Sequence, residues 1–299
     1  MRVAVTGAGG RLGRAMVAAL AEAPFTGLSR PIAWTRADFD LDAPEAAAAL
    51  IRGDRPELVI HAAAWTDVDG CARDPDLAFA RNATATGVLA RACATAGVDL
   101  VVVSTNEVFD GERSTPYAPD DEPRPINPYG ASKLEGERTA AGAYAGAQGR
   151  LGIARTSWLF GPPGNDFPAR ILAAAERARD AGEPLRVVGD EHGSPTYTHD
   201  LAEAIVELVS DGDVGGIHHL VNGGVISRAG WARELFRQAR VAAAIEEVPA
   251  ATWPRASSPP LRAVLAPTPL PSGEPMRPWQ QALADYLPTL LRQRATAAR

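Results

Sequence analysis

The sequence predicts an α/β fold in which a doubly wound parallel sheet is followed by a smaller C-terminal region. In residues 1–160, short apolar runs alternate with longer segments of helical periodicity. The runs are apolar almost throughout, as expected of parallel strands that helices cover on both faces. A glycine-rich loop directly after the first run, TGAGGRLG (6–13), is typical of the strand-to-helix turn of a Rossmann-type sheet.

The individual elements follow from local periodicity. Apolar, β-branched runs predict strands at 3–6, 32–34, 58–64, 100–104 and 153–160. The segments between them predict helices at 13–23, 43–52, 76–96 and 130–142. After residue 160 the rhythm loosens and predicts helices at 166–182, 198–211, 228–240 and 277–292, with short strands near 185–188 and 217–221. A proline-rich segment predicts an irregular surface excursion over 249–275.

Composition excludes several classes of protein. The 299 residues are 46% hydrophobic and 22% charged, which is ordinary for a globular chain. The formal net charge of −6 argues against a nucleic-acid or anionic-membrane surface. We find no 18-residue apolar run, no signal peptide before the first strand and only two cysteines. We therefore expect a cytoplasmic protein without a disulfide framework.

Three glycines of the first loop, Gly7, Gly10 and Gly13, lie between the first strand and the first helix. Glycines there permit a tight turn and the close approach of a pyrophosphate, which then sits at the positive end of the helix. Their place at the start of a repeating β/α pattern predicts a dinucleotide-binding site rather than an ordinary turn.

The tip of the second strand reads IAWTR and lacks the acid that usually grips the ribose 2′-hydroxyl of NAD. Thr35 and Arg36, with Arg11 in the glycine loop, could instead receive a 2′-phosphate. This favours NADPH as the cofactor over NADH. If Arg36 is only a solvated charge, NADH stays open.

A tyrosine and a lysine, Tyr129 and Lys133, lie four residues apart in NPYGASK (127–133). Asn127 is a favoured N-cap and Pro128 suits the first helical position, so a helix begins here. The spacing places Tyr129 and Lys133 on one helix face. An ammonium about 5 Å from a phenol favours the phenolate by about 3 kcal/mol at an effective dielectric constant near 20, or roughly two pK units. We therefore expect a tyrosine that exchanges a proton near neutral pH.

With Ser104-Thr105 at the end of the fourth strand, these features resemble the extended short-chain dehydrogenase/reductases, and more narrowly the dTDP-4-dehydrorhamnose reductase family. The resemblance covers nearly the whole chain and keeps the order of the family's motifs. It rests on HAAAWTDVD (61–69), STNEVFDG (104–111), PINPYGASKLEGE (125–137), RTSWLFG (155–161), GDEHGSPTYTHDLA (189–202) and PWQQALADYL (278–287). It implies an NADP(H)-binding Rossmann domain at 1–160, joined by parts of 195–225, and a mainly substrate-binding region at 161–299.

The resemblance also implies roles. Tyr129 would protonate the C4 carbonyl oxygen of a nucleotide-linked sugar while the nicotinamide delivers a hydride. Lys133 would hold the nicotinamide ribose and lower the pKa of Tyr129, and Thr105 would hydrogen-bond the same oxygen. With the residues named above, the expected cofactor set is Gly7, Gly10, Arg11, Leu12, Gly13, Thr35, Arg36, Asp40, Leu41, Ala63, Ala64, Trp65, Val103, Tyr129 and Lys133. The expected substrate set is Thr105, Asn106, Glu107 and Trp158.

Two departures from the family lie on the substrate side. The family's Asp-Tyr after the threonine is Asn106-Glu107 here, which puts a carboxylate where the family has an aromatic ring. The segment ASSPPLRAVLAPTPLP (256–271) lacks the family's run of arginine-proline, serine and leucine-aspartate. Reduction of some nucleotide sugar is therefore a safer expectation than reduction of dTDP-4-dehydrorhamnose itself.

Other interpretations stay open from the sequence. An epimerase or dehydratase with retained NAD(P) would use the same tyrosine and lysine, although 299 residues is short for those relatives. A non-catalytic regulatory subunit would keep the fold and the cofactor loop. The five histidines lack metal-binding spacing, and no carboxylate cluster requires the magnesium that some relatives use, so magnesium is neither predicted nor excluded. We expect His61 to be a hydrogen-bonded core residue, Trp158 to be either a sugar contact or core, and the protein to be a monomer or homodimer.

Overall fold

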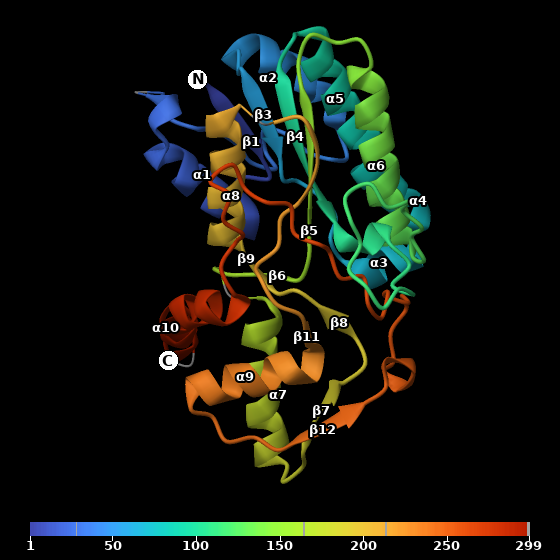
Figure 1. Ribbon diagram of the computed structural model, residues 1–299, viewed down its shortest axis with the longest axis vertical. Helices are drawn as coiled ribbons and strands as arrows, with labels where there is room; N and C mark the ends of the chain where they lie inside the picture. Colours follow the sequence, from blue (N-terminus) through green and yellow to red (C-terminus); the bar gives the residue numbers. More distant parts are fainter. Residues whose placement is uncertain (28, 164, 213, 298–299) are drawn as a thin grey trace.

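A six-stranded parallel sheet forms the upper part of the molecule in the computed structural model (Figure 1). The structure describes residues 1–27, 29–163, 165–212 and 214–297, so four positions of the expected 161–299 region (164, 213, 298 and 299) lie outside the described residues. The strand order is β10-β5-β4-β3-β1-β2. The strands are β1 (Val3–Thr6), β2 (Ile32–Trp34), β3 (Leu58–His61), β4 (Asp99–Thr105), β5 (Leu151–Thr156) and β10 (Gly216–His219). The predicted fold class is confirmed.

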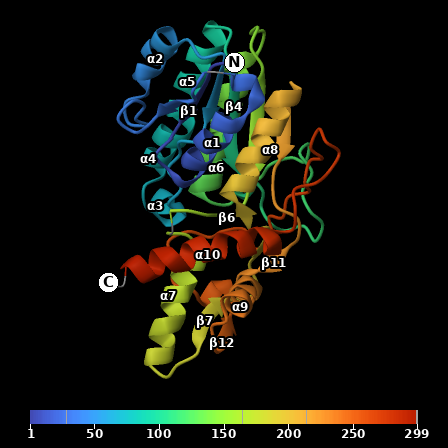
Figure 2. The ribbon, with the colours of Figure 1, turned by 90° about the vertical axis from the view of Figure 1, so that its left-hand side faces the viewer.

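Helices cover both faces of this sheet (Figures 1 and 2). On one face α1 (Arg11–Glu22) packs beside α8 (Thr198–Asp211). On the other face lie α2 (Ala47–Asp54), α5 (Ala85–Thr95) and α6 (Pro128–Tyr144). The chain runs from β1 outward to β2 and then returns to β3 on the other side of β1. Ligands bind at such a reversal, outside the carboxyl ends of the strands, so the expected site lies after β1 and β3.

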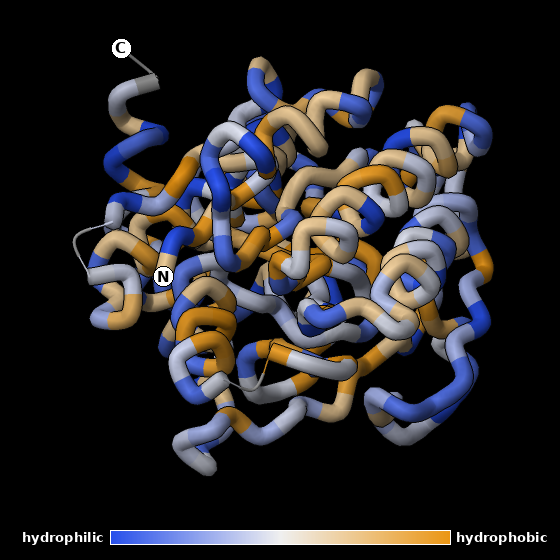
Figure 3. The backbone as a smooth tube through the Cα atoms, turned by 90° about the horizontal axis from the view of Figure 1, so that it is seen from above, coloured by the Kyte–Doolittle hydropathy of each residue, from blue (hydrophilic) through white to orange (hydrophobic). Residues whose placement is uncertain are grey.

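The lower part of the molecule has its own apolar core. Trp231, Leu235 and Phe236 of α9 (Arg228–Ala239) form an apolar stripe and are buried there against Trp279 and Tyr286 of the last helix. Figure 3 shows apolar segments gathered in the interior with hydrophilic segments around them. The other elements of this part are β6 (Leu159–Phe160), α7 (Phe167–Asp180), β7 (Leu185–Val188), β8 (His192–Gly193), β9 (Thr196–Tyr197), β11 (Ile226–Ser227), β12 (Ile245–Val248) and α10 (Trp279–Ala297).

Two expected strands are shorter than predicted. β3 ends at His61 rather than at residue 64, since the Ala63 amide donates to the side-chain oxygen Oγ1 of Thr6 in β1 (3.2 Å) and not to a backbone carbonyl. The expected strand 153–160 is interrupted after β5 by Trp158, whose φ of +46° is outside the extended region.

The expected helix 76–96 is also divided. The chain forms α4 (Pro75–Phe79), a π-helical turn over Ala80–Thr84, and then α5. A further short helix, α3 (Val68–Arg73), was not predicted from the sequence. π-turns are frequent at functional sites, and this one carries the buried Asn82.

The proline-rich segment 249–275 is irregular apart from one 3₁₀ turn at Ala250–Thr252, as predicted. Its expected surface position is only partly right. Ala263, Val264 and Leu265 are buried, and Ala263 and Leu265 join a small apolar cluster with Phe109 and Tyr117. Over the described ranges, no helix is long and apolar enough to cross a membrane.

A substitution at Gly13 tests how closely the glycine loop is packed. An added Cβ at Gly13 would lie 2.1 Å from the Gly7 carbonyl oxygen, whereas one at Gly9 would meet nothing within 4 Å. Gly13→Ala should therefore lower the free energy of unfolding by about 1–3 kcal/mol through overpacking. Gly9→Ala, the matched control, should change it by less than about 0.5 kcal/mol. Urea unfolding followed by circular dichroism measures both, and equal small effects would contradict the packing argument.

Candidate active site

The predicted catalytic residues meet at the carboxyl end of β4. Thr105 is the last residue of β4, and Tyr129 and Lys133 project from the first turns of α6; all three are buried. Asn127 caps α6, because its Oδ1 accepts a hydrogen bond from the Gly130 amide (2.8 Å). Gly130 lets the helix approach the end of β4, since a Cβ there would lie 2.0 Å from the Glu107 carbonyl oxygen. A hydrogen bond joins the Tyr129 and Thr105 side chains.

Lys133 is fixed by the sheet. Its Nζ donates a hydrogen bond to the Val103 carbonyl oxygen (2.8 Å). Burial lowers the pKa of Lys133 to about 8, with the nearby Glu137 carboxylate acting in the opposite direction. The lysine therefore carries its positive charge at neutral pH.

The expected lowering of the Tyr129 pKa is wrong for this structure. Burial raises the pKa of the Tyr129 phenol, and the negative charge of Glu107 raises it further, while the hydrogen bond with Thr105 acts the other way. Helix spacing brings only the lysine charge near the phenol, whereas desolvation and the charge of Glu107 come from segments distant in the sequence. Tyr129 is consequently a protonated phenol at neutral pH, which is the form a proton donor needs.

A buried ion pair ties the catalytic helix to the sheet. Arg155 of β5 reaches Glu137 of α6 through Nη2–Oε2 at 2.7 Å and Nε–Oε1 at 3.1 Å, with side chains only 2% and 4% exposed. Ser104, the residue before Thr105, donates a short hydrogen bond to the same carboxylate. Glu137 lies four residues after Lys133, on the same helix face. One contact therefore fixes the positions of β4, β5 and α6 relative to each other.

A second buried hydrogen-bond network links the last residues of β1 and β3 to α5 and α6. His61 Nδ1 lies 2.8 Å from Thr6 Oγ1, and His61 Nε2 lies 3.1 Å from Thr86 Oγ1. Thr86 donates to the Asn82 carbonyl oxygen (2.7 Å), and the Asn82 side chain donates to Ser132 Oγ on α6 (3.1 Å). His61 is thus the hydrogen-bonded core residue expected from the sequence. Burial, with a smaller contribution from the Lys133 charge, lowers the pKa of His61 to about 3.

The glycine loop has the geometry that a dinucleotide pyrophosphate requires. Gly7 has φ of +64° and lies so close to Ala63 that a Cβ would be 2.9 Å from the Ala63 backbone. Gly10 is the N-cap of α1 and offers no side chain, and the first turn of α1 has no acidic residue. The first amides of the helix therefore stay available to an anion. The remaining expected contacts, Leu12, Gly13, Ala64 and Trp65, flank this loop within α1 and after β3.

The residues expected to bind the 2′-phosphate of the cofactor do not all lie together. Thr35 Oγ1 donates to Asp38 (2.8 Å), and Arg36, 75% exposed, contacts Asp40 at 3.2 Å and Asp42 at 3.4 Å. Arg11 points elsewhere, because its Nε donates to the Gly161 carbonyl oxygen (3.0 Å). Asp40 and Leu41 follow directly at the same edge.

On the substrate side, Glu107 is a half-buried residue whose carboxyl group accepts a hydrogen bond from Asn127 Nδ2 (2.7 Å). Burial raises its pKa, and the Asn127 hydrogen bond opposes this. Asn106 donates through Nδ2 to the Ala263 carbonyl oxygen (2.9 Å), and its Oδ1 accepts a hydrogen bond from Thr105 Oγ1 (3.4 Å). Trp158 packs partly against the lower core, and the Arg228 guanidinium lies 3.5 Å from its ring centre.

Sequence reasoning missed several residues of this site. Asn82, Glu191, Arg228 and Arg255 had no assigned role, although Glu191 lies inside a quoted motif and Arg255 interrupts a proline-rich run. Their positions depend on contacts between distant segments. Among the described residues, no group of three or more His, Cys, Asp or Glu side chains is arranged to hold a metal ion.

A Rossmann-type sheet with a buried threonine, tyrosine and lysine at its carboxyl edge defines an extended short-chain dehydrogenase/reductase. The particular family follows from sequence comparison. The profile described as "RmlD substrate binding domain" matches residues 1–292, so the chain belongs to this family.

Individual relatives agree with this assignment. A dTDP-4-dehydrorhamnose reductase of Mycobacterium tuberculosis is 38% identical over 96% of this chain and 92% of that protein. A crystal structure of a dTDP-4-dehydrorhamnose reductase from Clostridium acetobutylicum has a TM-score of 0.88 at 31% identity, covering 97% of this chain and all of that one (100%). A Bacillus anthracis dTDP-4-dehydrorhamnose reductase, solved in complex with NADP, has a TM-score of 0.86 at 30% identity, with 96% and 99% covered.

The buried ion pair leads to a stability prediction. Arg155→Leu should lower the free energy of unfolding by about 3–5 kcal/mol, because it leaves the Glu137 carboxylate buried without its partner. The double variant Arg155→Leu/Glu137→Leu should lose less, since no unpaired charge remains. Arg186→Leu, which removes an exposed arginine 4.0 Å from Glu246, should cost under about 1 kcal/mol. Urea unfolding compares the three, and similar losses for Arg155→Leu and Arg186→Leu would refute the role of the pair.

His61 leads to a pH prediction. The native histidine has a pKa near 3, well below the ordinary 6.5, so between these values the unfolded chain binds a proton that the folded chain does not. Stability should therefore fall as the pH drops through this window, by about 1.4 kcal/mol per pH unit from this residue. His61→Gln removes the titrating group but can still hydrogen-bond. Unfolding free energies at pH 6.5 and 5 should show a shallower decline in His61→Gln, and an unchanged decline would exclude His61 as a source.

Proposed function

We propose that this protein reduces the C4 ketone of a nucleotide-activated deoxysugar with NADPH, in the manner of the dTDP-4-dehydrorhamnose reductases to which it is similar. The observation that carries the proposal is the burial of Thr105, Tyr129 and Lys133 together at the end of β4, beside the glycine loop, in a chain of this family. dTDP-4-dehydrorhamnose is the leading candidate substrate, because several relatives named dTDP-4-dehydrorhamnose reductase match this chain over nearly their whole length.

The proposed reaction divides the work between cofactor and protein. NADPH, when bound, supplies the hydride. Thr105 and Tyr129 hydrogen-bond the ketone oxygen, and Tyr129, protonated at neutral pH, donates its proton as the oxygen gains negative charge. The Lys133 ammonium lies on the same helix face and stabilises the phenolate that remains. The ketone thereby becomes an alcohol.

The preference for NADPH rests on two observations. Arg36 and Thr35 stand after β2, where a 2′-phosphate would lie, and a related structure contains NADP. The first 160 residues, joined by the returning α8 and β10, would hold the cofactor, and the remaining C-terminal region would hold most of the nucleotide sugar. Two free, buried cysteines agree with a reducing cytoplasm.

The proposal predicts turnover that depends on Tyr129. Purified protein with NADPH and dTDP-4-dehydrorhamnose should oxidise NADPH stoichiometrically, read from nicotinamide absorbance, and more slowly with NADH. Tyr129→Phe should lower turnover by about a hundredfold or more, because the ketone loses its proton donor. NADPH affinity should stay within about twofold, because the hydroxyl is only one of many expected cofactor contacts. NADPH binding without oxidation on any 4-keto nucleotide sugar would overturn the proposal in favour of a regulatory subunit. Full activity in Tyr129→Phe would remove Tyr129 as the proton donor.

A further inference from the structure

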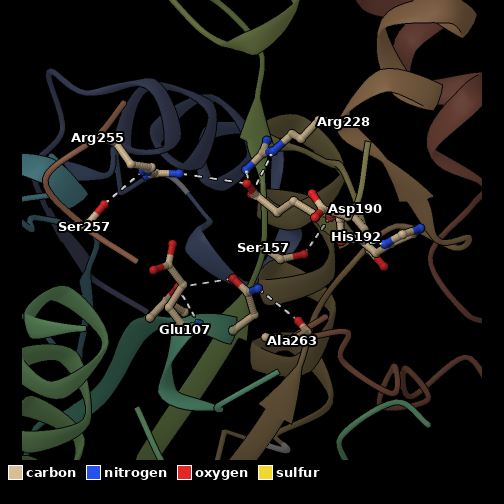
Figure 4. A network of polar contacts seen from close by, with 12 residues as sticks. Glu107, Ser157, Asp190, His192, Arg228, Arg255, Ser257 and Ala263 are labelled. Carbon is tan, nitrogen blue, oxygen red and sulfur yellow. Dashed lines mark hydrogen bonds and ion pairs between the residues drawn. The ribbon is translucent and has the colours of Figure 1, made fainter. Parts of the chain in front are cut away.

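A cluster of charged side chains on the substrate side is not used by the proposed proton transfer. Glu191 pairs with Arg228 and Arg255, and Arg255 also pairs with Asp69. The charges of Glu191 and of the two arginines act on Glu107, which Figure 4 shows together with Arg228 and Arg255. These residues come from segments far apart in the sequence: Asp69 from α3, Glu191 from the turn before β8, Arg228 from the start of α9, and Arg255 from the proline-rich segment.

Two guanidinium groups converge on one carboxylate. Arg228 donates through Nε and Nη2 to Glu191 Oε1, at 3.0 and 2.8 Å. Arg255 approaches the other oxygen, with Nη1 3.9 Å from Glu191 Oε2. The Glu191 side chain is only 7% exposed, so its charge is largely removed from water and held by these two arginines. In Figure 4, Arg228 and Arg255 enter the network from two different directions.

Both arginines have N–H donors that make no hydrogen bond to another described residue. Arg255 uses only Nε for hydrogen bonds, to Ser257 Oγ at 3.1 Å and to Asp69 at 3.4 Å. Within the described part of the chain, the terminal nitrogens of Arg255 and Nη1 of Arg228 make no hydrogen bond. The two side chains are about a quarter exposed, at 26% and 24%, so a ligand can reach them. Guanidinium groups with free donors that face one point suit an anion with several oxygens.

The cluster lies beside the catalytic residues. The Arg228 guanidinium covers the Trp158 ring, and the charges of Arg228 and Arg255 both act on Glu107, two residues after Thr105. In a nucleotide sugar the diphosphate is attached at C1, across the ring from C4. When the C4 oxygen of such a sugar contacts Tyr129, the diphosphate therefore points away from α6. The charged cluster provides two cationic side chains, Arg228 and Arg255, on the substrate side.

We propose that Arg228 and Arg255 bind the diphosphate of the nucleotide sugar, and that Glu191 holds both guanidinium groups in position until the anion arrives. The ligand's identity rests on the proposed function, whereas the site itself suits any nucleoside diphosphate. Asp69 and Ser257 keep Arg255 in place from the other side.

Isothermal titration of the full-length protein with dTDP, UDP, thymidine and NADP⁺ tests this proposal. In Arg228→Gln and Arg255→Gln, the affinity for the nucleoside diphosphate that wild type binds more tightly should fall about tenfold to hundredfold, the range for a charged hydrogen bond. Affinities for thymidine and NADP⁺ should stay within about twofold. Arg233→Gln is the matched control, since Arg233 lies on the same helix and pairs with Glu247 at the surface. Circular dichroism melting of each variant verifies folding.

Several outcomes would overturn the proposal: wild type that binds neither dTDP nor UDP, variants that bind them as wild type does, or equal losses for thymidine and dTDP. A loss of NADP⁺ affinity would assign the arginines to the cofactor instead. The readout is independent of turnover. If no 4-keto sugar is reduced but the diphosphate affinities fall as expected, the arginine site stands and the proposed reduction fails.

Discussion

The arrangement of the active site depends on the buried contact between Arg155, Glu137 and Ser104. Thr105 stands at the end of a strand, while Tyr129 and Lys133 stand on a helix, and a shift of either element would separate the threonine from the tyrosine. Taking two charges out of water is costly, so the pair is maintained only with good geometry and additional hydrogen bonds. The two short Arg155–Glu137 contacts and the Ser104 hydroxyl meet that requirement. The ion pair thus contributes positional accuracy more than net stability.

The same structure explains how a tyrosine can serve as an acid here. Burial and the Glu107 charge keep the phenol protonated, while the Lys133 ammonium is held by the Val103 carbonyl on the same helix face. The lysine then acts on the charge that appears during the reaction rather than on the resting phenol. Electrostatic stabilisation of this kind acts where charge develops, which is what separates catalysis from simple binding.

The substrate side follows a different principle from the cofactor side. Around the glycine loop, backbone groups and small residues provide the binding surface, and close packing leaves little freedom for substitution. Around Glu107, Arg228 and Arg255, charged side chains from separate segments neutralise one another. A site of this kind can change its ligand through single side chains while the sheet and the catalytic helix stay the same.

The sequence by itself determined the sheet, the glycine loop and the residues of the proton donor, because these depend on local periodicity, capping and turn chemistry. Asn127, Pro128, Tyr129 and Lys133 lie within one helical turn or two, so their mutual placement follows from helix geometry. Only the tertiary structure decided the protonation state of Tyr129, the π-turn that positions Asn82, and the convergence of Arg228 and Arg255 on Glu191. Desolvation and long-range charge pairing arise between segments that are distant in the sequence, and no local pattern encodes them.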